Sequence, residues 1–315
     1  MPISSKFNKF LFFLILISSL IFIFNIIPKN NAKEKANNHI NSDNSLVSKK
    51  ENWGYKDTIV KRTLSNNKIK IAILDSGINK EHPDLKGRIH KEFNAISPEE
   101  PVKDKFNHGT PIAGIIAAKD DSNGIKGISP KSEIYSVKVL NDKGEGSVDH
   151  IIKGIEWAIN EKVEIINISF GFKNHNKKLK KIVNKATSNG IIIVASSGNN
   201  YINDVDYPAK YNNVISVGSI DQEHERVKFS PRGKIDVVGP GRDILSTNNL
   251  NDFSIFEGTS FSTAYVTGLI SLYLSEKPTI KFDQKAIIKL LKNQSLDLGI
   301  KGKDNTYGYG LLQYK

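Results

Sequence analysis

The 315-residue chain contains no cysteine. This absence excludes disulfide bonds, thiol catalysis, cysteine-ligated zinc and a lipid-modified cysteine, but exported proteins can also lack disulfides. The chain also lacks a dense basic block interleaved with aromatic residues, although its formal net charge is +12. We therefore interpret the charge as a scattered lysine bias with a general attraction to anionic surfaces, and we expect no nucleic-acid partner.

The composition is that of an ordinary globular protein, with 38% apolar and 25% charged residues. Most of the chain is therefore expected to fold. Its length is enough for one large α/β domain with an extension, and a core of that size is readily buried. We expect a single folded domain over residues 53–315, in which Trp53 and Tyr55 are the first packing residues.

The first 28 residues predict a membrane anchor or a signal segment. Lys6 and Lys9 precede an apolar run over residues 10–27, and Lys29 follows it. As a helix the run would extend roughly 27 Å, which is the short end of what spans a bilayer. The run is longer than the apolar core of a typical signal peptide, and no A-x-A cleavage site follows it. We favour an uncleaved anchor over a cleaved signal, with the remaining chain exported in either case.

Residues 29–52 are mainly lysine, asparagine and serine, with few side chains to bury. We expect a flexible tether or a short pro-segment. Beyond this segment, patterns typical of strands and helices alternate. Strands are predicted over residues 68–74, 134–140, 163–168, 191–195 and 214–219, and helices over residues 110–118, 148–160, 177–189 and 265–274. This alternation implies an α/β fold with a mostly parallel sheet and helices on both faces, in which ligands bind beyond the carboxyl ends of the strands.

Ser260 is the first candidate for chemistry. It lies in the small-residue stretch GTSFSTA, directly before an apolar helical pattern. This arrangement would place Ser260 at a helix N-terminus, where backbone N–H groups and the helix dipole favour a developing negative charge. An acyl-transfer nucleophile would be suited to that position, although a plain N-cap serine would also fit.

Three further residues could complete a hydrolytic site. Asp75 ends the first buried strand, where a carboxylate needs a partner, although it could be a turn residue. His108 precedes a helical pattern and could instead be a surface or capping histidine. Asn199 follows a strand and could donate its amide to an oxyanion, or occupy a simple turn. Aspartate, histidine and serine in this chain order match one known order of the hydrolytic triad, whereas the lipase motif G-x-S-x-G is absent.

The chain resembles the subtilisin-like serine proteases, the subtilases, over approximately residues 53–312. Four blocks carry the resemblance: AILDSGI around Asp75, HGT around His108, SSGN around Asn199 and GTSFSTAYVTG around Ser260. The resemblance implies a three-layer subtilisin-like fold and a serine endopeptidase with Asp75, His108 and Ser260 as its triad. Asn199 and the backbone N–H of Ser260 would form the oxyanion hole, and the chemistry would need no cofactor.

Three positions depart from the family pattern. Pro111 replaces the usual histidine after HGT, and Ala264 and Tyr265 replace the usual proline and histidine after the serine. None of these changes removes a reacting group, so we expect them to affect positioning alone.

The resemblance also implies two segments that pair with the substrate backbone. Their residues would be Gly144, Glu145, Gly146, Ser169, Phe170 and Gly171. Glycines let a peptide approach as an added strand. Asp206 matches the floor of the pocket for the residue before the cut, where a carboxylate would favour arginine or lysine, and Glu145 beside the neighbouring subsites points the same way. The alternative is that Asp206 is a solvated loop acid.

The stretch KDDSNGI over residues 119–125 resembles the calcium loop of the family, with Asp84 as its distant carboxylate ligand. The implied oxygen ligands would come from Asp84, Lys119, Asp121, Asn123 and Ile125. Calcium takes about 6 to 8 oxygen ligands, so the donor types fit, although an acidic turn without metal is the alternative.

We therefore expect an exported endopeptidase with peptide or protein substrates, membrane-anchored through its N-terminal segment or secreted. Cleavage after basic residues suggests a processing role, as in subtilases that trim leader peptides. The stretch before residue 53 is too short for the folded prodomain of many exported subtilases. A broad scavenging protease and, from another class, an inactive subtilase fold kept as a binding module are the alternatives. The presence of Asp75, His108, Asn199 and Ser260 speaks against the inactive form.

Overall fold

The computed structural model describes residues 52–61, 65–121, 124–201, 204–276 and 284–315. Within these ranges, no helix combines the length and apolar character needed to cross a membrane. The expected anchor over residues 10–27 lies outside the described residues, and so does nearly all of the expected tether. The description below therefore concerns the folded unit that follows them.

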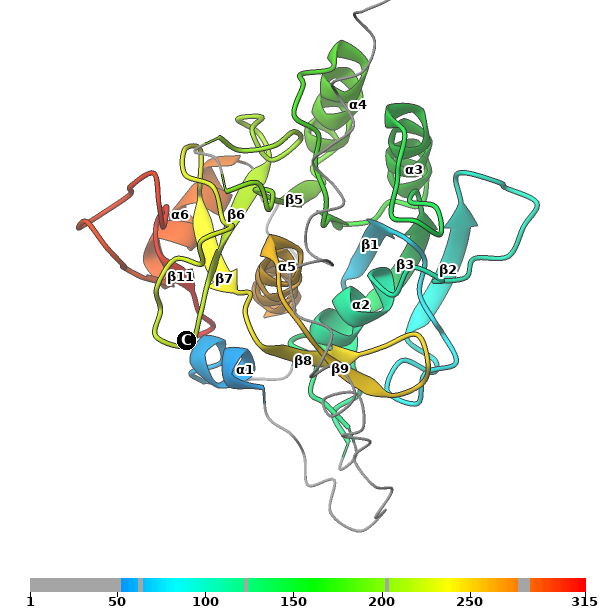
Figure 1. Cartoon of the computed structure of the whole chain (residues 1–315), viewed down its shortest axis with the longest axis horizontal. Helices are drawn as coiled ribbons and strands as arrows, with labels where there is room; N and C mark the ends of the chain where they lie inside the picture. The colour runs from blue at the N-terminus through cyan, green and yellow to red at the C-terminus, as the bar shows by residue number, and fades with distance from the viewer. Residues whose placement is uncertain (1–51, 62–64, 122–123, 202–203, 277–283) are drawn as a thin grey trace, which may run out of the picture. The chain divides into compact units, whose positions relative to one another are not determined.

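A nine-stranded sheet forms the middle layer, with the strand order β10-β11-β7-β6-β5-β4-β1-β3-β2 (Figure 1). Its strands are β1 (Lys70–Asp75), β2 (Ile89–Asn94), β3 (Glu133–Lys138), β4 (Ile165–Ile168), β5 (Ile192–Ser196), β6 (Ile215–Ile220), β7 (Val237–Pro240), β10 (Ser295–Leu296) and β11 (Leu311–Leu312). All of its pairings are parallel except that of β10 with β11. Two further strands, β8 (Ile244–Thr247) and β9 (Phe253–Phe256), form a separate antiparallel ribbon.

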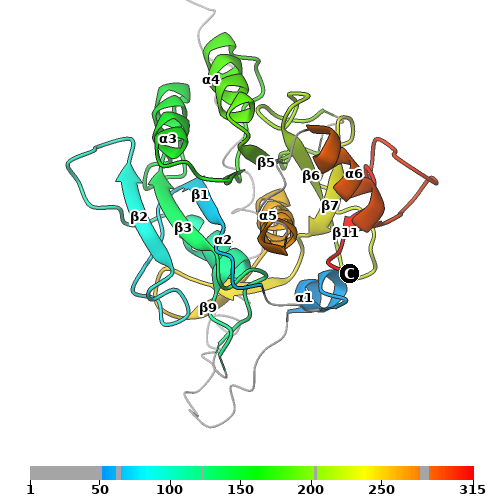
Figure 2. The ribbon, with the colours of Figure 1, turned by 180° about the vertical axis from the view of Figure 1, so that it is seen from behind.

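Helices cover both faces of the sheet, as the two opposite views show (Figures 1 and 2). They are α1 (Trp53–Thr58), α2 (Gly109–Ala117), α3 (Val148–Asn160), α4 (Lys177–Ser188), α5 (Thr259–Glu276) and α6 (Gln284–Gln294). The helices α3 and α4 lie on one face, and α2 and α5 lie on the other. This is the three-layer α/β arrangement expected from the sequence.

The strand β1 shows how its sequence serves both faces. Ile71 and Ile73 belong to the buried cluster that includes α2 and α5, whereas Ala72 and Leu74 belong to the cluster that includes α3 and α4. All four side chains are at most 1% exposed. Because neighbouring side chains of a strand point to opposite faces, a strand covered on both sides needs apolar residues at every position.

The two sequence ends of this folded unit are hydrogen-bonded to each other. The backbone N–H of Tyr314 donates to the carbonyl of Thr58 at 2.7 Å, and the N–H of Val60 donates to the carbonyl of Tyr314 at 3.0 Å. Nearby, the side-chain amide of Gln313 donates to the carbonyl of Asp57 at 2.8 Å. The helix α1 is thus joined to the residues that follow β11.

The predicted elements agree closely with those observed. The helix predicted over residues 148–160 has the same bounds as α3, and the other predicted elements differ from the observed ones by a few residues at their ends. The serine helix is the main difference, because α5 begins at Thr259 and therefore includes the candidate nucleophile in its first turn.

Candidate active site

The four residues expected to carry chemistry lie at the carboxyl ends of parallel strands or at helix N-termini. Asp75 is the last residue of β1, and His108 directly precedes α2. Asn199 follows the end of β5 by three residues, and Ser260 is the second residue of α5. This is the edge where ligands bind in parallel α/β sheets.

Asp75 and His108 are directly hydrogen-bonded. The distance from His108 Nδ1 to Asp75 Oδ1 is 2.7 Å, and the backbone N–H of Ser76 donates to the same oxygen at 2.7 Å. The carboxyl group is 1% exposed. An ionised carboxylate can only accept hydrogen bonds, so Nδ1 carries the proton and Nε2 is left as the basic nitrogen of the ring.

The pKa of His108 is set by opposing effects. Burial of the imidazole lowers it, whereas the charge of Asp75, the hydrogen bond to Asp75 and the charge of Asp104 raise it. The net result is a pKa above the ordinary value of 6.5. A base with a raised pKa accepts a proton more readily, and the nearby carboxylates stabilise the cation that forms.

The start of α2 lies close against the end of β1. A Cβ atom on Gly109 would lie 2.1 Å from the carbonyl oxygen of Gly77, so a larger residue at position 109 would separate the two segments. Pro111 falls in the first turn of α2. A proline is tolerated there because the first N–H groups of a helix have no intrahelical partner. The departure at position 111 is therefore compatible with this placement of His108.

Ser260 is held by a backbone contact. Its hydroxyl donates to the carbonyl oxygen of Ser169 at 2.6 Å. Within the described part of the chain, the hydroxyl makes no hydrogen bond to His108. Rotation about χ1 would release it, because a serine side chain moves readily between staggered rotamers.

Asn199 is oriented by Thr259, the residue before Ser260. The Asn199 Oδ1 atom accepts from the backbone N–H of Thr259 at 3.0 Å and from its hydroxyl at 2.9 Å. Because the two donors fix the oxygen side of the amide, the amide nitrogen is directed away from Thr259. The Nδ2 group is thus available as a donor beside the first turn of α5, which contains the backbone N–H of Ser260.

The other two departures lie within α5. Ala264 is fully buried, and Tyr265 is 2% exposed. A Cβ atom on Gly54 of α1 would lie 2.7 Å from the Tyr265 ring, so this ring packs directly against the first helix. Tyr265 therefore serves the contact between α5 and α1, and Ala264 is part of the buried core.

The first expected substrate segment forms a tight turn. Gly146 pairs with Leu140 in an isolated antiparallel bridge, and the backbone N–H of Asn141 donates to the carbonyl of Glu145 at 2.8 Å. Phe106 is 42% exposed, and its ring lies against Gly144, where an added Cβ would be 2.3 Å away. The Glu145 carboxylate accepts from the Asn141 side chain at 3.0 Å. This acid is thus at the surface of the turn.

The second expected segment directly follows β4. Ser169 contacts Ser260 as described above, and Phe170 and Gly171 continue from it. Phe172 then forms a pair of backbone hydrogen bonds with Tyr207, each 2.8 Å long. This pairing brings the second segment beside Asp206.

Asp206 is buried but has a cationic partner. It is 8% exposed, and its Oδ1 atom accepts from Lys173 Nζ at 2.9 Å and from the Asn200 amide at 3.3 Å. The Lys173 side chain is 58% exposed. Sequence reasoning misses Lys173, because nothing in the local pattern distinguishes it from the other lysines of that stretch.

Four of the five residues of the expected calcium loop are described, and Asn123 lies outside the described residues. Asp84 is 4% exposed, and its Oδ2 atom accepts from the backbone N–H of Ile125 at 2.9 Å. Burial raises the pKa of Asp84 most strongly; the Ile125 hydrogen bond opposes it, and the charge of Asp121 raises it further. A buried carboxylate next to a second carboxylate fits a site for a cation.

Side-chain ligands alone do not make up a metal centre here. No group of three or more histidine, cysteine, aspartate or glutamate side chains is placed to hold a metal ion within the described residues. A calcium ion in this loop would therefore depend on backbone carbonyl oxygens, such as those of Lys119 and Ile125.

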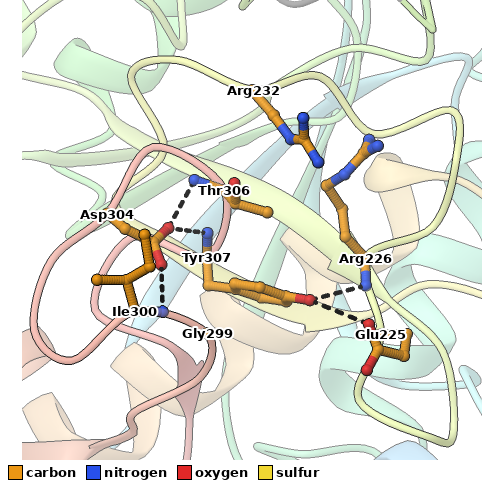
Figure 3. A pocket seen from close by; sticks show the side chains of 8 residues that line it. All are labelled: Glu225, Arg226, Arg232, Gly299, Ile300, Asp304, Thr306 and Tyr307. Atoms are coloured by element: carbon orange, nitrogen blue, oxygen red, sulfur yellow. Dashed lines mark hydrogen bonds between the residues drawn. The ribbon is translucent and has the colours of Figure 1, made fainter.

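A cavity of about 270 Å³ lies away from these candidates, between the loop after β6 and the C-terminal loop (Figure 3). Its lining residues are Glu225, Arg226, Arg232, Gly299, Ile300, Asp304, Thr306 and Tyr307. The Asp304 carboxylate accepts from three backbone N–H groups of its own loop. None of the lining residues is a catalytic candidate, so we do not assign the substrate to this cavity.

Comparisons with known proteins identify a family and several relatives. The model of the Subtilase family matches residues 66–310. The chain is 38% identical to Subtilisin Savinase of Lederbergia lenta over 252 residues, covering 80% of this chain and 91% of that protein. It is 38% identical to M-protease of Shouchella clausii over 252 residues, covering 80% of this chain and 64% of that protein. It is 41% identical to a Subtilisin of Bacillus pumilus over 216 residues, covering 67% of this chain and 78% of that protein.

Proposed function

The chain belongs to the subtilase family, and we propose that this serine endopeptidase uses Asp75, His108 and Ser260 as its catalytic triad. The observation that carries the proposal is the 2.7 Å hydrogen bond between His108 Nδ1 and the buried Asp75 carboxylate. This bond leaves His108 Nε2 as the base, at the same edge of the sheet as the helix that presents Ser260.

The proposed reaction begins with rotation of the Ser260 hydroxyl away from Ser169. The Ser260 Oγ atom attacks the carbonyl carbon of the scissile bond while His108 Nε2 takes its proton. Asp75 stabilises the resulting imidazolium. The imidazolium then returns the proton to the leaving amine, and a water molecule hydrolyses the acyl-enzyme by the same steps.

Two donors would stabilise the oxyanion of the tetrahedral intermediate. These are Asn199 Nδ2 and the backbone N–H of Ser260. The contacts of Asn199 Oδ1 with Thr259 support this role, because they hold the amide in one orientation before the substrate binds. Donors that are already oriented need no reorganisation as the charge develops, which is the main benefit of an oxyanion hole.

We further propose that substrates are cleaved after arginine or lysine. The support is Asp206, a nearly buried carboxylate beside the segment Ser169–Gly171. Glu145, at the surface of the other proposed substrate segment, adds a second negative charge. This pattern favours a processing protease that is exported and tethered through its N-terminal segment; a broad scavenging protease would show no such preference.

We also propose that calcium stabilises the loop beside Asp84. The ion would be held by Asp84 and Asp121 with backbone carbonyl oxygens of residues 119–125, and it would supply structural stability alone. Measuring the melting temperature of the Ser260→Ala variant with calcium and with a chelator tests this proposal. An unchanged melting temperature would contradict it, and Asp84→Asn should remove any calcium-dependent increase.

Cut-site mapping tests the catalytic and specificity proposals together. The full chain and its Ser260→Ala variant would be incubated with a peptide library, and the products identified by mass spectrometry. We expect cleavage after arginine or lysine by the unmodified chain and none by the variant. Cleavage by Ser260→Ala would contradict the triad, whereas equal kcat/KM for arginine and leucine before the cut would contradict the basic pocket alone.

A further inference from the structure

We propose that Asp104 is a positioning residue for His108, which fixes the loop of this histidine to the end of β1 and places a second negative charge near its imidazole. The inference rests on the proposed role of His108 as the base. Asp104 belongs to no motif recognised in the sequence.

The carboxylate of Asp104 is a buried acceptor for an unusually large set of donors. It is 7% exposed. Its Oδ1 atom accepts from the Ser76 hydroxyl at 2.8 Å, from the backbone N–H of Asn107 at 2.8 Å and from that of His108 at 3.4 Å. Its Oδ2 atom accepts from the backbone N–H of Thr110 at 2.9 Å and from its hydroxyl at 2.6 Å.

These donors are neighbours of Asp75 and His108 in the sequence. Asn107 and Thr110 lie on either side of His108 in the chain, and Ser76 is the residue directly after Asp75. The Ser76 hydroxyl also accepts from the backbone N–H of Gly109 at 3.0 Å. Asp104 therefore joins the two segments whose separation determines whether the hydrogen bond between Asp75 and His108 can form.

An acceptor for local N–H groups alone could be a purely structural turn. The hydrogen bond from Ser76 distinguishes a positioning residue from a structural turn, because it links the histidine loop to the end of β1. A shift of about 1 Å in a catalytic group can reduce the rate about a hundredfold, so a carboxylate that fixes this distance acts directly on kcat.

The negative charge of Asp104 has a second effect, on the pKa of His108. Two carboxylates act on the imidazole, Asp75 from β1 and Asp104 from its own loop, and both raise the pKa of His108 against the effect of burial. A buried cation on the neighbouring strand β3, the ammonium of Lys138, donates to the carbonyls of Ser76 at 2.7 Å and Lys103 at 3.2 Å. Removing the charge of Asp104 should therefore make the imidazolium less stable.

The test compares Asp104→Asn with Ser76→Ala. Asp104→Asn would keep the shape of the side chain but lose the charge and one acceptor, because an amide cannot accept from donors on both sides. We expect kcat to fall about ten- to one hundredfold with little change in KM. The acid limb of the kcat/KM profile should move to lower pH. Ser76→Ala keeps the charge, so it should lower kcat about fivefold without moving the acid limb.

Asp236→Asn is the matched control. Asp236 is another mostly buried carboxylate with several donors, among them the backbone N–H of Ser216 at 3.0 Å and Lys303 Nζ at 2.8 Å, and it belongs to none of the proposed sites. Its substitution should lower thermal stability while leaving the acid limb of the profile unchanged. A purely structural role for Asp104 would give the same result in both carboxylate variants.

A direct titration of His108 keeps the inference testable whatever the activity. The ring protons of His108 would be followed by NMR in the Ser260→Ala background, with assignment by His108→Ala. Asp104→Asn should lower the observed pKa. If kcat and the titration are both unchanged by Asp104→Asn, the inference is wrong while the triad stands. If His108→Ala retains full activity, the triad proposal fails, and the inference fails with it.

Discussion

Lys173 Nζ lies 2.9 Å from Asp206 Oδ1, so the carboxylate proposed to select basic substrates already holds an ammonium group from its own chain. A basic substrate side chain must displace this lysine or share the carboxylate with it. The Lys173 side chain is mostly exposed although the Asp206 carboxylate is buried, so the ammonium can move into solvent when another cation takes its place at the carboxylate. The lysine would thus weaken the preference for basic residues without abolishing it.

Replacing Lys173 with methionine should strengthen that preference. We expect kcat/KM for arginine before the cut to rise by up to about fivefold relative to leucine, because the competing cation is gone. The measurement is a pair of fluorogenic peptides that differ only at this residue. Lys210→Met is the control, since Lys210 pairs with the exposed Asp204 at 2.7 Å on the same loop. An unchanged ratio in Lys173→Met would show that Lys173 does not compete with the substrate.

Replacing Asn199 with leucine should remove one oxyanion donor while keeping a similar volume. We expect kcat to fall about 10²- to 10³-fold with KM nearly unchanged, because the interaction forms mainly in the transition state. Steady-state kinetics on one peptide checks this expectation. Asn213→Ala is the control, because Asn213 contacts Asn184 and Thr187 instead. An equal effect on kcat and on substrate affinity would argue for a role in binding.

The pH dependence of activity should show the raised pKa of His108. Only the neutral imidazole can take the proton of Ser260, so kcat/KM should fall on acidification with an apparent pKa above 6.5. A pH series with a neutral substrate measures this limb. An apparent pKa below 6.5 would mean that burial outweighs the carboxylates.

His108 should also affect the unfolding free energy, but its contribution should decrease as pH rises, whereas kcat/KM increases. Because its folded-state pKa is raised, its contribution is fully present below pH 6.5 and is lost as pH rises through the folded-state value. Comparing unfolding free energies of Ser260→Ala with and without His108→Ala across this window tests the sign, in a background that cannot digest itself.

Gly114 is a site where one methyl group should disturb both folding and catalysis. Its added Cβ would lie 2.3 Å from Thr247 Oγ1 on β8, and the Thr247 hydroxyl donates to the carbonyl of Thr110 in the first turn of α2. Gly114→Ala should cost about 1–3 kcal/mol of unfolding free energy and lower kcat, because α2 carries the histidine loop. Chemical denaturation checks this, with the exposed Lys181→Ala as the control. A fully stable Gly114→Ala would mean that β8 moves aside.

Five strands of the sheet and four helices could be predicted because their apolar patterns are local, whereas β2, β7, α1 and α6 are not among the predicted elements. Val148–Asn160 is an amphipathic stretch with a serine N-cap, and Ile71 to Leu74 is apolar at every position. The short strands β10 and β11 have two residues each, which is too few to show the alternation of apolar and polar residues that is typical of a strand. Their pairing depends on the tertiary structure.

The candidate site could be predicted in its composition but not in its contacts. Asp75 and His108 are 33 residues apart, and only the folded chain shows that their side chains meet. The contacts of Lys173 with Asp206 and of Asp104 with Ser76 also join residues that are far apart in the sequence. In the sequence, nothing distinguishes Lys173 or Asp104 from charged residues of the surface. The direction of the Ser260 hydroxyl toward Ser169 is a rotamer choice, which no sequence pattern reports.

The hydrogen bonds that join Thr58 and Val60 to Tyr314 connect two segments that are made at very different times during synthesis. The helix α1 is made long before its backbone partner Tyr314, and β11 fills a place between β7 and β10 inside the sheet. A chain whose synthesis has not yet reached β11 therefore lacks one strand of its central layer. Completion of the sheet must wait until β11 has been made, and until then one edge of β7 is uncovered.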